Sequence, residues 1–121
     1  MVRHLKEGAG WRLGYDPSAN VFQGLVGGDG WAIELTKAEF SDFCRLALQL
    51  ADTLRSLSAE LMDEERVTCE QETPQIWLEV EGFPDQFALR FILLEGRQAE
   101  GGWDEMTTAA IIQAIPAITL F

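Results

Sequence analysis

The stretch TKAEFSDFCRLALQLADTLRSLSAELMDEE, residues 36–65, decides the fold, because its thirty residues include no Gly and no Pro. Apolar residues recur along it in alternating steps of three and four, and a second apolar row runs beside them. This spacing has the period of a helix, and the two rows form a face wide enough to pack in a domain core. The first row consists of Phe40, Phe43, Ala47, Leu50, Leu54, Leu57 and Leu61, and the second of Cys44, Leu48, Ala51 and Met62.

The start of this helix carries its own signals. Thr36 is the predicted N-cap, and Glu39 three residues later completes a capping box. Leu35 and Phe40 occupy the positions of a hydrophobic staple. At 1.5 Å per residue the helix would be about 45 Å long, whereas a compact domain of this size is about 35 Å across. Other elements must therefore cover its length.

Short strands are predicted on both sides of the helix, where apolar and polar residues alternate between turn formers. Three lie before it, at residues 10–16, 21–26 and 31–35, and a glycine-rich run predicts a hairpin between the last two. Four lie after it, and a second helix is predicted over about 107–115, ending near Pro116. The four later strands are 67–72, 76–81, 87–94 and 97–103.

The two halves of the chain resemble each other. Setting Trp31 over Trp103, an offset of 72, also sets Thr36 over Thr108 and one apolar helix face over another. Each half is then a set of strands followed by a helix. We therefore predict an α+β fold built from a duplicated antiparallel β-unit followed by a helix, with the long helix packed against the shorter C-terminal one. Residues 1–121 would form a single domain with an internal pseudo-repeat, about 10–65 and 67–121.

The net charge of −11 is unevenly distributed. Residues 1–59 hold seven acidic and six basic residues, whereas residues 60–105 hold thirteen acidic and three basic residues. Such a surface repels phosphate backbones and anionic lipid and attracts basic partners. We therefore expect no nucleic-acid partner and no membrane partner, and a basic or apolar protein partner if there is one. Solubility alone is the alternative explanation.

Six acidic or aromatic residues are the candidates for a binding surface. Trp77 and two carboxylates alternate on one predicted strand face, while three more carboxylates end the long helix, where the helix dipole favours cations. A solvated acidic face is the competing interpretation, and neither group has the spacing of a calcium loop. The candidates are Trp77, Glu79, Glu81, Asp63, Glu64 and Glu65.

Catalytic groups are hard to assemble from this sequence. His4 is the only histidine, no Ser lies in a Gly-x-Ser-x-Gly elbow, and the glycine run at 24–30 is not followed by the Lys of a phosphate loop. Cys44 and Cys69 are predicted to be reduced, buried thiols. We predict no enzymatic activity, no cofactor and no metal site.

The ends of the chain bear on its location. Residues 1–8 have no apolar segment of the kind that a signal peptide needs. The apolar run 109–121 is too short to span a bilayer and contains Gln113 and Pro116. We expect a cytoplasmic protein.

Six motifs occur along the chain: Gly-Trp-Arg-Leu-Gly at 10–14, Gly-Leu-Val-Gly-Gly at 24–28, Trp-Ala-Ile-Glu-Leu-Thr at 31–36, Leu-Met-Asp-Glu-Glu at 61–65, Trp-Leu-Glu at 77–79 and Leu-Arg-Phe at 89–91. Together they resemble a small uncharacterised family of cyanobacteria and chloroplasts, over nearly the whole chain. The resemblance implies a fold similar to that of Whirly and transcriptional-coactivator regulators, which bind single-stranded DNA. Whirly proteins carry a Lys-Gly-Lys-Ala-Ala-Leu strand motif, and this sequence has none. The likeness therefore implies a fold without its site.

Three functions stay open at this point. The first is a non-enzymatic protein-interaction module with an acidic surface. The second is a single-stranded nucleic-acid-binding regulator of the Whirly-like type. The third is a small-ligand binder or enzyme with a pocket between the sheets. The sequence does not decide between a monomer and a homodimer.

Overall fold

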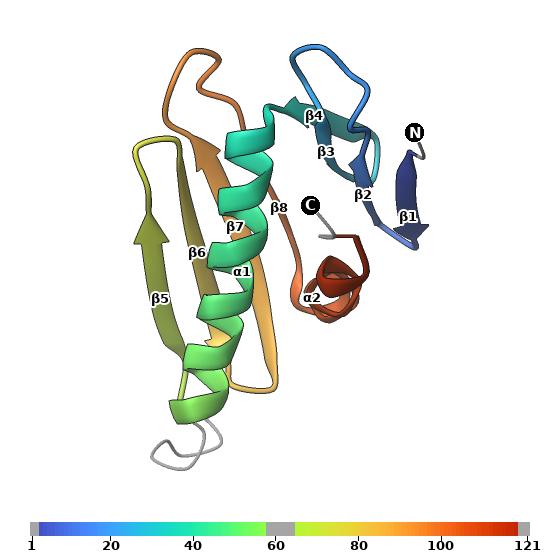
Figure 1. Ribbon diagram of the computed structural model, residues 1–121. Coiled ribbons are helices and arrows are strands. Elements are labelled where there is room, and N and C mark those ends of the chain that lie inside the picture. Colours follow the sequence, from blue (N-terminus) through green and yellow to red (C-terminus); the bar gives the residue numbers. More distant parts are fainter. Residues whose placement is uncertain (1–2, 58–64, 119–121) are drawn as a thin grey trace.

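A computed structural model describes residues 3–57 and 65–118 and contains two four-stranded antiparallel sheets, each followed by a helix (Figure 1). The predicted α+β fold, with one long helix and a shorter C-terminal one, is confirmed. Sheet A has the strand order β1-β2-β3-β4, and sheet B has the order β5-β6-β7-β8. The elements are β1 (His4–Gly8), β2 (Trp11–Tyr15), β3 (Gly24–Gly28), β4 (Trp31–Leu35), α1 (Lys37–Leu57), β5 (Val67–Glu72), β6 (Ile76–Phe83), β7 (Gln86–Leu93), β8 (Glu100–Trp103) and α2 (Glu105–Ile118).

The helices lie on the inner faces of the sheets (Figure 1). α1 runs along sheet B against β5 and β6, while α2 packs on β7 and also on β1 and β2 of sheet A. The two helices touch, as predicted, but sheet B covers more of α1 than α2 does. The long helix is therefore buried mainly by strands.

Both helix starts are capped by side chains. The backbone N–H of Thr36 donates to Glu39 Oε1 at 2.9 Å, and the N–H of Glu39 donates to Thr36 Oγ1 at 3.1 Å. This is the predicted capping box. In α2 the N–H of Thr107 donates to Asp104 Oδ1 at 2.9 Å, so Asp104 is the N-cap there.

The capping residues correct the offset between the two halves. Thr36 and Asp104 are 68 positions apart, so the predicted offset of 72 is wrong by four residues. A shift of four residues is about one helical turn, so an offset of 72 still sets the apolar face of one helix over that of the other. The apolar pattern alone therefore does not distinguish the two offsets. Six residues buried in α1 correspond at offset 68 to the six buried in α2: Phe40 to Thr108, Phe43 to Ile111, Cys44 to Ile112, Leu46 to Ala114, Ala47 to Ile115 and Leu50 to Ile118. The duplication itself stays a prediction.

Several predicted boundaries are wrong. Sheet A has four strands rather than three, because β1 pairs with β2 from His4↔Tyr15 to Gly8↔Trp11. β3 begins at Gly24 instead of residue 21, and β8 covers only the end of the predicted strand 97–103. α2 begins at Glu105 and continues past Pro116 to Ile118, where the buried Ile115 and Ile118 offset the missing N–H.

The end of the long helix is only partly described. α1 is helical to Leu57, and residues 58–64 lie outside the described part of the chain. Glu65 is not helical, so the predicted extension to residue 65 is wrong at its last residue. Two candidates, Asp63 and Glu64, lie outside the described residues.

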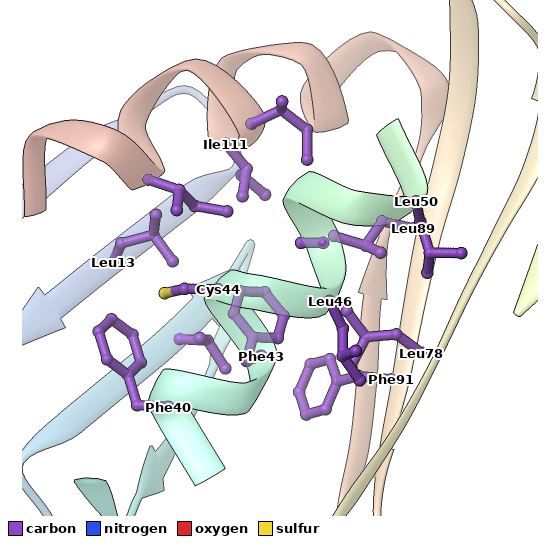
Figure 2. Close-up of a cluster of buried hydrophobic side chains, with 14 of the residues drawn as sticks. Leu13, Phe40, Phe43, Cys44, Leu46, Leu50, Leu78, Leu89, Phe91 and Ile111 are labelled. Atoms are coloured by element: carbon purple, nitrogen blue, oxygen red, sulfur yellow. The ribbon is translucent and has the colours of Figure 1, made fainter. Parts of the chain in front are cut away.

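One continuous hydrophobic core joins the sheets and helices. Figure 2 shows Leu13 of β2, Phe43 of α1, Phe91 of β7 and Ile111 of α2 gathered in it. The Trp103 ring lies 5.8 Å from the Phe43 ring and 5.7 Å from the Phe91 ring, between centroids. Its indole Nε1–H donates to the Gly27 carbonyl at 2.9 Å, which ties sheet B to sheet A inside the core.

Glycines make room for two of the tryptophans in sheet A. A Cβ on Gly28 would lie 2.4 Å from Nε1 of Trp31, its cross-strand partner. A Cβ on Gly8 would lie 2.5 Å from Nε1 of Trp11, also its partner. The indoles therefore lie flat over the neighbouring strand, which only a glycine there allows.

Candidate functional site

The outer face of sheet B carries the three described strand candidates. Along β6 the side chains of Ile76, Leu78 and Val80 are buried under α1, so those of the alternate positions point outward. Strand register adds outward residues from β5, β7 and β8. We call this surface the acidic face; it consists of Thr68, Glu70, Glu72, Trp77, Glu79, Glu81, Ala88, Arg90, Ile92, Glu100 and Gly102.

Arg90 places a positive charge among the carboxylates of the acidic face. Glu70 lies directly opposite Glu79, so like charges do face each other across β5 and β6. Glu79, however, also pairs with Arg90 (Nε to Oε1, 3.6 Å), and the Arg90 guanidinium lies 5.2 Å from the centre of the Trp77 ring. A basic side chain therefore lies beside Trp77 together with the predicted carboxylates.

Glu81 has a basic neighbour as well. Nη2 of Arg66 lies 4.0 Å from Oε1 of Glu81, and both side chains are about half exposed. The Arg66 guanidinium also lies 5.4 Å from the centre of the Phe83 ring. Exposed pairs at such distances contribute little to stability, so Glu81 stays available to another cation.

A hollow of about 330 Å³ opens on the acidic face. Ala88 and Gly102 face Glu81 and Arg90 across the neighbouring strands and supply almost no side chain. The missing volume leaves a depression over β7 and β8. Glu79, Glu81 and Asp104 line it, together with Arg90.

Glu65 lies apart from the helix that was expected to carry it. Its exposed position precedes β5, and it is not helical. Of the six candidates, the structure brings together Trp77, Glu79 and Glu81.

Two further hollows lie elsewhere on the molecule. One, of about 270 Å³, lies on the outer face of sheet A and is lined by Arg3, Arg12, Asp16, Phe22 and Glu34 among others. The other, of about 330 Å³, lies between α1, α2 and the β6–β7 turn and includes Ala51, Phe87 and Ile112. Neither follows from sequence alternation, because each combines residues from distant segments.

Cys44 is buried, whereas Cys69 is only partly buried, so the prediction of two buried thiols is confirmed for Cys44 alone. Burial raises the pKa of the Cys44 thiol to about 12, so it is protonated at neutral pH. Within residues 3–57 and 65–118, no group of three or more His, Cys, Asp or Glu side chains is placed to hold a metal ion. Over the same residues, no helix is long and apolar enough to cross a membrane.

The fold defines an α+β protein whose acidic sheet face has no assigned role. Residues 6–118 match the domain of unknown function DUF1818, and the chain belongs to that family. A crystal structure from Prochlorococcus sp. NATL2A, described as a protein with unknown function from the DUF155 family, is similar to it. The two chains share 32% identity and a TM-score of 0.90, over 97% of this chain and 98% of the other. No curated protein matches the chain.

These comparisons confirm the prediction of an uncharacterised family. Both the family and the similar structure are described as of unknown function, so they indicate no activity, ligand or partner for this chain. Neither comparison names Whirly proteins.

Proposed function

We propose that this protein is a non-enzymatic interaction module that binds a basic segment of a protein partner on the acidic face. The observation that carries the proposal is the hollow on that face, whose lining includes three acidic residues, Glu79, Glu81 and Asp104, and the small residues Ala88 and Gly102. Neither described helix lies over it, because α1 and α2 pack on the inner faces. A Lys or Arg side chain fits the hollow in both size and charge.

The geometry gives each group a role. The Arg90 guanidinium lies over Trp77, and its Nε faces Glu79. Glu81 and Asp104 are then the carboxylates best placed for a cation brought by the partner. The half-buried Trp77 ring and Ile92 provide apolar area beside the hollow for the stem of that side chain.

Electrostatics set the expected strength. The net charge of −11 draws a basic partner toward the molecule and speeds the encounter. Each exposed ion pair contributes at most about 1 kcal/mol, so a short peptide with four basic residues gains about 4 kcal/mol and should bind with a dissociation constant on the order of 1 mM. Salt should weaken it, because the Debye length is only about 10 Å at 0.1 M.

The test compares two variants of equal charge. Glu79→Gln with Glu81→Gln removes two carboxylates from the acidic face, and Asp29→Asn with Asp52→Asn removes two from exposed positions in the other half. The probe is a labelled Arg-Lys-Ala-Arg-Lys-Ala peptide, measured by fluorescence anisotropy. We expect a several-fold loss of affinity in the first variant and little change in the control. Equal losses of affinity in the two variants would mean that the peptide responds only to the net charge of the protein, which would overturn the proposal.

A Whirly-like regulator of single-stranded nucleic acid is the second proposal. It is supported by the arrangement of two four-stranded sheets, each followed by a helix, and by the Arg90–Trp77 contact, since base stacking uses such pairs. The carboxylates of Glu70, Glu72 and Glu79 around that contact oppose it. A labelled oligothymidylate in the same assay decides between the two proposals: micromolar binding that weakens with salt would support the regulator, whereas the interaction module predicts binding no better than about 10⁻⁴ M at physiological salt.

A further inference from the structure

The outer face of sheet A is also uncovered by the described helices. The register places Leu5, Gly14, Leu25 and Glu34 in one row across the four strands. The helices reach this sheet from its other side, where Leu13 and Val26 are fully buried. Among residues 3–57 and 65–118, no helix covers this face, and Leu5 on it is 49% exposed.

Exposed apolar side chains gather around this face. Five large hydrophobic residues are exposed in the described part of the chain, and three of them are Leu5 (49%), Val21 (59%) and Phe22 (36%). Leu5 and Phe22 line the 270 Å³ hollow together with Leu25, and Val21 is the neighbour of Phe22 in the chain. We call these four residues, Leu5, Val21, Phe22 and Leu25, the sheet A patch. Single exposed apolar residues are ordinary, but a group around a hollow indicates an interaction site.

Gly14 creates the hollow between the two leucines. A Cβ at this position would lie 3.4 Å from Leu5 Cδ1 and 3.5 Å from Leu25 Cβ, so a methyl group would contact both leucines and a longer side chain would extend into the hollow. With glycine there, the space is large enough for a leucine or phenylalanine side chain from another molecule. The face thus presents both protruding apolar groups and a recess that would receive them.

The charges around the patch are balanced, unlike those of the rest of the molecule. Arg3 and Arg12 line the hollow together with Asp16 and Glu34. Any second copy of the chain also carries a charge of −11, so it is repelled wherever carboxylates dominate. The outer face of sheet A is a place where two copies can meet with arginines of one opposite carboxylates of the other.

We propose that the outer face of sheet A is the interface of a two-fold symmetric homodimer of this protein. A two-fold axis places the same surface on both sides, so the protruding Leu5 or Phe22 of each copy enters the hollow of the other. The acidic faces, on the other sheet, stay free in such a dimer. This interface does not depend on the function proposed for the acidic face, and it would present two copies of that face to one partner.

The test is the molar mass of the purified chain in solution. Sedimentation equilibrium from about 1 µM to about 500 µM should show association from 13.5 kDa toward twice that mass. Added NaCl should strengthen association, because it screens the repulsion between two acidic chains. A chain that stays at 13.5 kDa throughout would overturn the proposal.

A matched pair of variants locates the interface. Leu5→Glu puts a charge in the sheet A patch and should weaken association at least about tenfold. Met106→Glu changes another exposed apolar residue, 79% exposed on α2, and should leave it unchanged. Circular dichroism confirms that both variants fold. A dimer that responds equally to both variants, or to neither, would place the interface elsewhere and contradict the proposal.

Discussion

Arg97 is predicted to hold the two halves of the molecule together at the start of α1. It lies in the β7–β8 loop, yet its guanidinium donates to the Glu34 carbonyl at the end of β4 and pairs with Glu39 at 2.5 Å (Nη2 to Oε1). It also lies 4.6 Å from the centre of the Phe22 ring. Arg97 is 63 positions from Glu34 and 58 positions from Glu39 in the sequence, so both contacts join distant segments of the chain.

The cost of Arg97→Ala follows from what would be left behind. Glu39 is only 5% exposed, and its Oε1 would keep the Thr36 N–H as a donor but lose the guanidinium. Breaking a fully buried pair costs about 3–5 kcal/mol, and Arg97 is about one third exposed, so about 2 kcal/mol is expected here. The cation–π contact with Phe22 adds about 0.5 kcal/mol. The total of about 2.5 kcal/mol corresponds to a fall in Tm of roughly 10 °C for a domain of this size.

Urea unfolding of four proteins would measure this interaction directly. The set consists of the wild type, Arg97→Ala, Glu39→Gln and the double variant, which together give the coupling free energy. We expect a coupling of about 1–2 kcal/mol. An Arg97→Ala variant within about 0.5 kcal/mol of the wild type would refute the reasoning, because Glu39 would then not depend on its partner.

Three further changes test the core and the thiols. Leu50→Asp buries an unpaired charge at a position only 2% exposed, so urea unfolding should show a loss of several kcal/mol, and an unchanged Tm would exclude this face of α1 from the core. Gly28→Ala would displace the Trp31 indole, so near-ultraviolet circular dichroism should change and stability should fall by about 2 kcal/mol; an unchanged spectrum would contradict the close approach. Because the pKa of Cys44 is raised from 9.0 to about 12 in the folded state, its contribution to stability is complete below pH 9 and is lost between about pH 9 and 12. Cys44→Ala should remove the fall in the free energy of unfolding that Cys44 causes in this pH range. If the variant and the wild type lost stability identically with rising pH, the raised pKa of Cys44 would be contradicted.

The sequence predicted the elements whose signals are local. The capping box of Thr36 and Glu39 and the helical period after it depend on neighbours three and four residues apart, and both occur in the structure. β1 was missed because it is an edge strand of sheet A and is itself made of mostly polar residues. Its one Leu, Leu5, points to the outer face. An alternation of apolar residues is absent there, so only the pairing with β2 reveals the strand.

The site was predicted in part for the same reason. Alternation along one strand placed Trp77, Glu79 and Glu81 on one face, and the register of sheet B agrees. The position of Arg90 beside them depends on which strand pairs with β6, and the hollow depends on β7 and β8 bringing Ala88 and Gly102, which have almost no side chain, to the same face. Pairing across strands brings these residues together, and no spacing within one segment encodes it.

The measurement that tests the central claim most directly is a titration of ¹⁵N-labelled protein with the Arg-Lys-Ala-Arg-Lys-Ala peptide, followed by NMR. If a basic segment occupies the hollow on sheet B, the largest shifts should occur at the amides of Ala88 and Gly102 and at the Trp77 indole N–H. The amides of the sheet A patch should move little. Shifts spread evenly over both sheets, or concentrated on sheet A, would contradict the account.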